Sequence, residues 1–186
     1  ERELEGTATG LLRARTGPAF ILQSSTNVDR MVSMYNAAKA ADRLFLQELY
    51  MAEIACAAGE SIPNPRTFRD VRVFVHRGYA PEDDRYATLQ TYGRRAIGRD
   101  RIAKARFAMC VRSSMLSYLQ KLRQRMDYAD GLLLYSMWEG YKREPGMLNF
   151  LSECEAMGLA VVSLHTSGHA DAQAIVDLVE RVNPSR

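Results

Sequence analysis

The chain has 186 residues, of which 47% are apolar and 25% are charged, the balance of a folded globular protein. This composition excludes a disordered tail, a collagen-like repeat and a disulfide-stapled miniprotein, and a chain of this length can bury a core of its own. No apolar run approaches the length that crosses a bilayer, so we expect no membrane span. The first residues, 1–5, are charged and lack both Met and an apolar leader, which predicts a segment cut from a longer protein and not a secretory leader.

The net charge of +3 is mild, but it is unevenly distributed. Between Arg66 and Arg112, eleven arginines and one lysine stand against five acidic residues, so this segment carries +7 and the rest of the chain −4. Arginine presents a planar fork that matches phosphate oxygens. A solvated surface and a nucleic-acid contact both explain such a segment.

Three cysteines, Cys56, Cys110 and Cys154, are far apart in the sequence and form no CxxC pair. This spacing argues against a zinc ribbon and against a disulfide framework. We therefore expect reduced thiols of a cytoplasmic protein, each serving as a small core residue.

Short β-rich runs alternate with helical patterns along the whole chain. In chain order the sequence predicts a helix over 1–15, a strand over 19–23, a helix over 27–41, a strand over 43–47, a helix over 49–58, a strand over 71–75, a basic loop with one or two short helices over 77–104, a strand over 107–111, a helix over 114–126, a strand over 131–135, a helix over 145–157, a strand over 159–164 and a helix over 172–182. Ser114 is expected to cap the fourth long helix, and the last helix is expected to turn Ile175, Val176, Val179 and Val182 inward.

This alternation of about six strands with helices predicts an α/β fold, a doubly wound and mostly parallel sheet with helices on both faces. The uninterrupted apolar strands indicate burial on both faces. In such folds ligands collect at the carboxyl ends of the strands. The polar residues that follow each strand are therefore the first candidates for a site.

Three such turns carry hydroxyl, amide or guanidinium groups. Ser25, Asn27 and Arg30 follow the first strand, where they can cap a helix or bind an anion. Arg112 and Ser113 follow the fourth strand in a similar arrangement. Ser136 follows the fifth strand, and the nearby Trp138 and Tyr141 form a stacking surface or pack under a loop.

The turn after the sixth strand is the most informative segment of the sequence. His165 and His169 lie four residues apart, with Ser167 and Gly168 between them, directly before a helix. Histidine can act as an acid, a base or a metal ligand, but both side chains can also form ordinary structural hydrogen bonds. Catalytic zinc usually needs three protein ligands, which argues against a metal site complete within this chain. No Walker loop and no G-x-G-x-x-G follows a strand.

The run Ala160 to Ala170, with its Ser-Gly-His element, resembles the beta-CASP group of metallo-beta-lactamase-fold hydrolases, to which ribonuclease J and the cleavage-and-polyadenylation nucleases belong. The segments Ser24 to Arg30, Leu49 to Glu53 and Tyr135 to Tyr141 are similar to bacterial members of the group. The resemblance covers nearly the whole chain. It implies a Rossmann-like domain that is inserted into a zinc-binding domain and closes over it, with the substrate in the cleft between them.

The resemblance implies roles for several residues. His169 would be the catalytic histidine near the scissile phosphate, and His165, Ser167 and Gly168 would shape the phosphate pocket around it. Ser25, Asn27, Arg30, Arg112, Ser113 and Ser136 are candidates for further phosphate or substrate contacts. The implied substrate is RNA or another phosphodiester.

The departures from the family pattern are equally informative. The zinc-binding His-x-His-x-Asp-His motif is absent, so the two zinc ions implied by the resemblance would belong to the parent protein. We therefore expect residues 1–164 to form the beta-CASP domain and 165–186 to begin the return into the missing metallo-beta-lactamase domain. Without zinc ligands there is no metal-activated water, so this fragment alone is predicted to be inactive. The exposed docking face is expected to promote self-association.

Two other functions stay open at this point. The same architecture could hydrolyse a small-molecule ester, and the scaffold could serve as a non-catalytic phosphate-binding module. Fold class alone does not choose between them. Salt-dependent binding would favour nucleic acid.

Overall fold

The computed structural model describes residues 1–165 and 172–183. Its helices are α1 (Arg2–Arg13), α2 (Val28–Ala40), α3 (Leu49–Ala58), α4 (Asp84–Thr91), α5 (Arg99–Ile102), α6 (Leu116–Arg123), α7 (Pro145–Ala156) and α8 (Ala172–Val182). Its strands are β1 (Ala19–Leu22), β2 (Leu44–Glu48), β3 (Val71–Phe74), β4 (Ala96–Ile97), β5 (Phe107–Val111), β6 (Gly131–Tyr135) and β7 (Leu159–Ser163). Three short 3-10 helices cover Gly93–Arg95, Ser113–Met115 and Glu139–Arg143.

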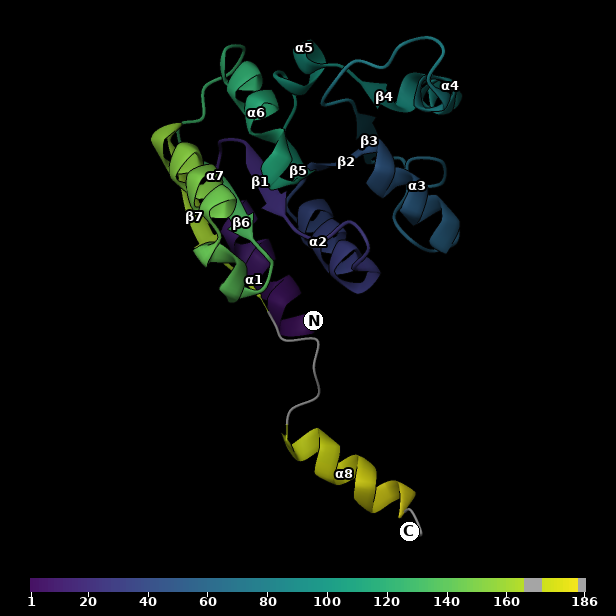
Figure 1. Cartoon of the computed structure of the whole chain (residues 1–186), viewed down its shortest axis with the longest axis vertical. Coiled ribbons are helices and arrows are strands. Elements are labelled where there is room, and N and C mark those ends of the chain that lie inside the picture. The colour runs from purple at the N-terminus through teal and green to yellow at the C-terminus, as the bar shows by residue number, and fades with distance from the viewer. Residues whose placement is uncertain (166–171, 184–186) are drawn as a thin grey trace.

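The strands form one sheet in the order β4-β3-β2-β5-β1-β6-β7, and every neighbouring pair in it is parallel. Figure 1 shows this order from β4 on the right to β7 on the left. The central strands β1, β5 and β6 are buried along their whole length, as strands covered on both faces must be. The structure therefore confirms the predicted doubly wound α/β class.

The additional strand, β4, is short and lies in the segment predicted to be a loop. It has two residues and pairs with Val73 and Phe74 of β3 at the edge of the sheet. Ile97 is buried there, but two residues are too few to show the alternation by which a strand is recognised in a sequence. The sequence therefore predicted six strands, whereas the sheet formed by the described residues has seven.

The two faces of the sheet bury separate apolar clusters. One cluster joins the strand residues Phe20, Leu46 and Phe107 to residues of α5, α6 and α7. The other joins Ile21 and Phe45 to residues of α1, α2 and α3. Successive strand residues point to opposite faces, which is why Phe20 and Ile21 belong to different clusters.

Most predicted boundaries hold to within three residues, but the capping of α6 by Ser114 was predicted wrongly. Ser113–Met115 form a 3-10 turn, and no side chain caps either that turn or α6. Ser114 is exposed, and its hydroxyl was expected to accept a hydrogen bond from the helix. The 3-10 turn supplies the first backbone hydrogen bond instead, from the amide of Met115 to the carbonyl of Arg112.

Helix α8 has the predicted bounds, but the inward packing of its apolar side chains was a wrong prediction. Ile175, Val176, Val179 and Val182 are 46% to 62% exposed, and Leu178 is 61% exposed. The 3.6-residue spacing of these side chains produces one apolar face, yet neither apolar cluster of the sheet includes them. Periodicity predicts which face is apolar and does not say what covers it.

The cysteines agree in part with the sequence analysis. Cys110 and Cys154 are buried, Cys56 is half-buried, and all three are free thiols. Within the described residues, no helix is both long and apolar enough to cross a membrane.

Candidate functional site

The winding of the sheet changes direction at β1. From β1 the chain passes through α2 to β2 on one side, whereas β5 leads through α6 to β6 on the other side. The helices that make these two connections belong to opposite faces of the sheet. In open parallel sheets, ligands bind in the crevice outside the carboxyl ends of the strands at such a reversal.

A pocket of about 440 Å³ occupies this position. The loop after β1 contributes Gln23, Ser24 and Ser25 to it, and the turn after β5 contributes Arg112 and Ser113. We call it the serine pocket, and its walls also include Thr26, Tyr50, Ser114, Met137 and Met147. The structure thus brings together Ser25, Arg112 and Ser113, three of the residues singled out in the sequence.

Two side chains of the serine pocket are buried without a hydrogen-bond partner within the described residues. Ser25 is 6% exposed and Gln23 is 2% exposed, yet neither the Ser25 hydroxyl nor the two polar atoms of the Gln23 amide is bonded. Leaving a buried polar group unsatisfied costs roughly 1–3 kcal/mol, so such groups mark places where a partner is expected. A ligand with oxygen acceptors and donors would satisfy them.

Arg112 is held at the rim of the serine pocket by groups from β2 and α3. Its Nη2 lies 3.4 Å from Oε2 of Glu48, whose side chain is only 3% exposed. The guanidinium also lies over the Tyr50 ring, 5.9 Å from the ring centroid. Glu48 itself is fixed because it accepts hydrogen bonds from the backbone amides of Tyr50 and Met51 at the start of α3. Arg112 therefore presents a positioned positive charge.

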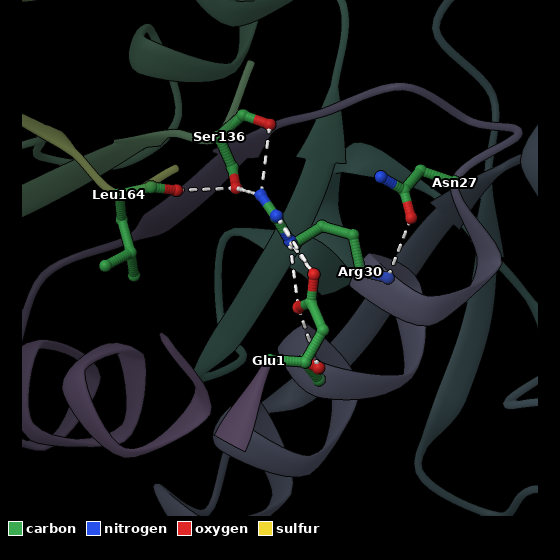
Figure 2. A network of polar contacts seen from close by, with 6 residues as sticks. Glu1, Asn27, Arg30, Ser136 and Leu164 are labelled. Atoms are coloured by element: carbon green, nitrogen blue, oxygen red, sulfur yellow. Dashed lines mark hydrogen bonds and ion pairs between the residues drawn. The ribbon is translucent and has the colours of Figure 1, made fainter. Parts of the chain in front are cut away.

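Arg30 does not line the serine pocket but lies in a buried network beside it. Its side chain is 2% exposed, and its guanidinium donates to the Glu1 carboxylate and to the Ser136 hydroxyl. Figure 2 shows Arg30 between these two groups. The Ser136 hydroxyl in turn donates to the Leu164 carbonyl at 2.7 Å, which links α2 to the ends of β6 and β7.

Asn27 lies at the start of the same helix and acts as its N-cap. Its side-chain oxygen accepts a hydrogen bond from the Arg30 amide at 3.0 Å, as Figure 2 shows. This geometry is the capping role that the sequence left open beside anion binding. Asn27 is also absent from the lining of the serine pocket.

His165 lies at the end of β7, near the Arg30 network. It is exposed, and partial burial together with the positive charge of Arg30 lowers its pKa. The other predicted residues of this turn, Ser167, Gly168 and His169, lie outside the described residues. The part of the predicted phosphate pocket that depends on them is consequently not described by the structure.

A wider hollow of about 820 Å³ lies beside Trp138 on the loop after β6. Trp138 is 61% exposed and meets Tyr141 edge-on, with the ring centroids 5.4 Å apart, so these aromatics do not pack under a loop. The residues that line this hollow include Lys142 and Arg143. Within the described residues, none of them has a buried polar atom that lacks a hydrogen-bond partner. The serine pocket is therefore the better candidate for a specific polar ligand.

Metal-ligating side chains do not gather within residues 1–165 and 172–183. No three His, Cys, Asp or Glu side chains there come close enough to hold a metal ion. The described residues therefore contain no candidate metal centre.

Sequence reasoning missed Gln23, Glu48 and Tyr50 as components of the site. Gln23 was assigned to the end of a strand, and Glu48 was not noted because it is both the last residue of β2 and the N-cap of α3. Because the predicted strand ended at Gln47, the available signal was that the Glu48 carboxylate directly followed a predicted buried strand.

Comparison of the sequence with protein-family models gave no match. Comparison with curated protein sequences gave no match either.

Proposed function

We propose that this chain is the substrate-clamping domain of a phosphodiesterase and that the serine pocket binds a backbone phosphate of single-stranded RNA. The observation that carries this proposal is the serine pocket itself. It lies at the reversal point of the sheet, with unpartnered Ser25 and Gln23 side chains beside the positioned guanidinium of Arg112.

The chemistry of these groups suits a phosphate better than a neutral ligand. A phosphodiester offers only hydrogen-bond acceptors on its free oxygens, and the Ser25 and Ser113 hydroxyls and Nε2 of Gln23 can all donate. Oε1 of Gln23 needs a donor, which a ribose hydroxyl of RNA can supply. Arg112 adds a charge-assisted donor in a fork that matches two phosphate oxygens. Its partial pairing with Glu48 fixes its direction while leaving 40% of the side chain exposed.

The positive groups at this edge of the sheet are compatible with a polynucleotide. Arg77 and Arg85 line a neighbouring cavity together with Arg112. Arg106 of the same basic segment lies instead beside Pro18, at the opposite, amino ends of the strands. Positive charge beyond a single phosphate site suits a substrate with several phosphates. RNA fits these groups and the resemblance to the beta-CASP nucleases.

Within this proposal, hydrolysis needs a second domain. His169 would stand near the scissile phosphate, as in the beta-CASP group, while zinc and the attacking water would be supplied by a metallo-beta-lactamase domain of the parent protein. This chain alone would bind RNA without cleaving it.

The test is RNA binding by a variant in which the two pocket hydroxyls are removed. We expect the double variant Ser25→Ala, Ser113→Ala to bind a labelled single-stranded RNA of about 12 nucleotides at least roughly 100-fold more weakly, because two hydrogen bonds to a charged group are lost and each contributes about 1.5–3 kcal/mol. Fluorescence anisotropy measures the affinity. Ser152→Ala, on the exposed surface of α7, is the matched control and should bind as the unaltered chain does.

Equal affinity of the double variant and the control would contradict the assignment of the serine pocket. Binding of a small phosphate ester in place of RNA, with little dependence on salt, would favour the small-molecule alternative. If the unaltered chain bound neither RNA nor a small phosphate ester, the proposal would be overturned.

A further inference from the structure

A second pocket, of about 300 Å³, adjoins the serine pocket at the carboxyl ends of β2, β3 and β5. Arg112 and Tyr50 line both pockets. Its other lining residues include Glu48, His76, Arg77 and Tyr79, and we call this cavity the His76 pocket. A single guanidinium therefore stands between two cavities of different composition.

Two polar atoms in the wall of the His76 pocket are buried and have no hydrogen-bond partner within the described residues. They are Nδ1 of His76 and Nε of Arg112. Burial and the nearby Arg112 and Arg77 charges lower the pKa of His76, although Glu48 opposes the shift. The imidazole is consequently neutral at neutral pH, with one nitrogen able to accept a hydrogen bond and the other able to donate.

Aromatic and guanidinium groups line the same pocket. Arg77 and Arg85 lie over the ring of Tyr79, with guanidinium carbons 5.8 Å and 5.0 Å from the ring centroid. Arg112 lies over the ring of Tyr50, which is 54% exposed. Aromatic rings and guanidinium groups are side chains on which a nucleobase can stack.

The charges of the His76 pocket distinguish it from a second phosphate site. Glu48 and Glu53 line it together with three arginines, and Arg85 is already paired with Asp83. Arg77 is exposed and has no ion pair within the described residues. A neutral heterocycle with both donors and acceptors suits this mixture of carboxylate, imidazole and guanidinium groups better than a second anion does.

We propose that the His76 pocket receives one nucleobase of the same RNA whose phosphate lies in the serine pocket, with the base stacked on Tyr79 and Tyr50 and hydrogen-bonded to His76. This inference rests on the proposed function for the identity of the polymer. Arg112, which lines both cavities, would contact the phosphate that joins the bound base to the rest of the strand. The substrate is therefore a single strand, because a base paired within a duplex cannot enter the pocket.

The experiment compares Tyr79→Ala and His76→Ala with the unaltered chain, using a labelled RNA of about 12 nucleotides and, separately, adenosine monophosphate. Tyr86→Ala is the matched control, since Tyr86 is an exposed tyrosine of α4 that does not line the pocket. Removal of one stacking ring is expected to weaken RNA binding about 5-fold to 100-fold, and the control should leave it unchanged. Thermal unfolding of each variant shows that it is folded.

A second measurement addresses the base directly. In the unaltered chain, adenosine monophosphate should shift the ring NMR signals of His76, and inorganic phosphate at the same concentration should not. In Tyr79→Ala the nucleotide-induced shift should be largely lost. These signals report base binding whether or not a long RNA binds.

The outcomes separate the two proposals. If Tyr79→Ala and His76→Ala bind RNA as well as the unaltered chain does, while the Ser25, Ser113 double variant binds weakly, the His76 pocket is not a base site and the proposed function stands. If the nucleotide shifts the His76 signals but no RNA binds, base recognition stands and the polynucleotide function falls. If neither the nucleotide nor RNA binds, both are overturned.

Discussion

Arg43 is a fully ionised side chain that holds several segments together from inside the fold. It is 2% exposed, and its guanidinium donates to the carbonyls of Leu12, Arg15, Gly17 and Phe107 at distances of 2.6–3.2 Å. These bonds tie the end of α1 and the following turn to β5. Burial lowers the pKa of Arg43 to about 10, so the group stays protonated at neutral pH.

Replacement of Arg43 should therefore destabilise the whole domain. Arg43→Met keeps the apolar stem but leaves buried carbonyls without donors, and we expect it to lower the free energy of unfolding by about 3 kcal/mol or more. Urea denaturation measures the change: the urea concentration at the unfolding midpoint should fall, while the dependence of the free energy of unfolding on urea concentration stays the same. The control is Arg13→Met. Arg13 also donates to a carbonyl, that of Ala40, but its side chain is exposed. A loss for Arg43→Met no larger than that of the control would show that these bonds contribute little.

Asp130 gives the domain a specific sensitivity to acid. Its carboxylate accepts hydrogen bonds from the Thr16 amide, the Thr16 hydroxyl and Arg15, and these bonds lower its pKa to about 2. Because the folded pKa lies below the unfolded value of about 3.9, the stabilisation is present above that value and is lost as the pH falls towards 2.

Asp130→Asn should consequently be less stable than the unaltered chain at pH 7, and the difference should shrink between about pH 4 and pH 2. Asn is a suitable replacement because, like Asp, it tolerates the positive φ of 55° that residue 130 adopts. Thermal unfolding at a series of pH values measures the difference. A difference that stayed constant down to pH 2 would assign the effect to shape and not to charge.

The placement of individual candidate residues was only partly predictable from the sequence. Ser25, Arg112 and Ser113 line one pocket because polar groups directly after buried strands gather at one edge of a parallel sheet. The burial of Arg30 against Ser136 and Glu1 could not be predicted, since it joins residues from three distant parts of the chain. The exposure of Trp138 likewise depends on tertiary packing that no local pattern encodes.

At the scale of elements, long segments with clear periodicity were predictable and short ones were not. The bounds of β5, β6 and α8 agree with the prediction because each is an uninterrupted apolar run or a clear 3.6-residue pattern. Strand β4 and the 3-10 start of α6 were missed because they are two and three residues long. The partner of the apolar face of α8 is likewise not encoded in the helix itself.

The exposed face of α8 leads to a prediction about association. Leu178, Val179 and Val182 are each more than half exposed, and contiguous exposed apolar side chains promote contacts between molecules. We expect the average mass from light scattering to rise with concentration, and Leu178→Glu to reduce that rise. The control is Gln173→Glu, which adds the same charge to the same helix at an exposed polar position. A constant monomer mass for the unaltered chain would contradict the prediction.

At the scale of the whole molecule, the fold gathers the candidate binding groups on one edge. The serine pocket and the His76 pocket are built from loops that follow β1, β2, β3 and β5, segments up to about ninety residues apart in sequence. The basic segment from Arg66 to Arg112 supplies the third of these loops and ends at the fourth. Of this segment, Arg77, Arg85 and Arg112 line the His76 pocket, where they can contact a polyanion.

The most direct test of this account is the salt dependence of RNA binding by the unaltered chain. The affinity for a single-stranded RNA of about 12 nucleotides is measured by fluorescence anisotropy between about 50 mM and 200 mM salt. The account predicts that the logarithm of the affinity falls linearly with the logarithm of the salt concentration, with a slope of about −0.7 for each phosphate contacted. An affinity that did not change with salt, or the absence of binding at the lowest salt concentration, would contradict it.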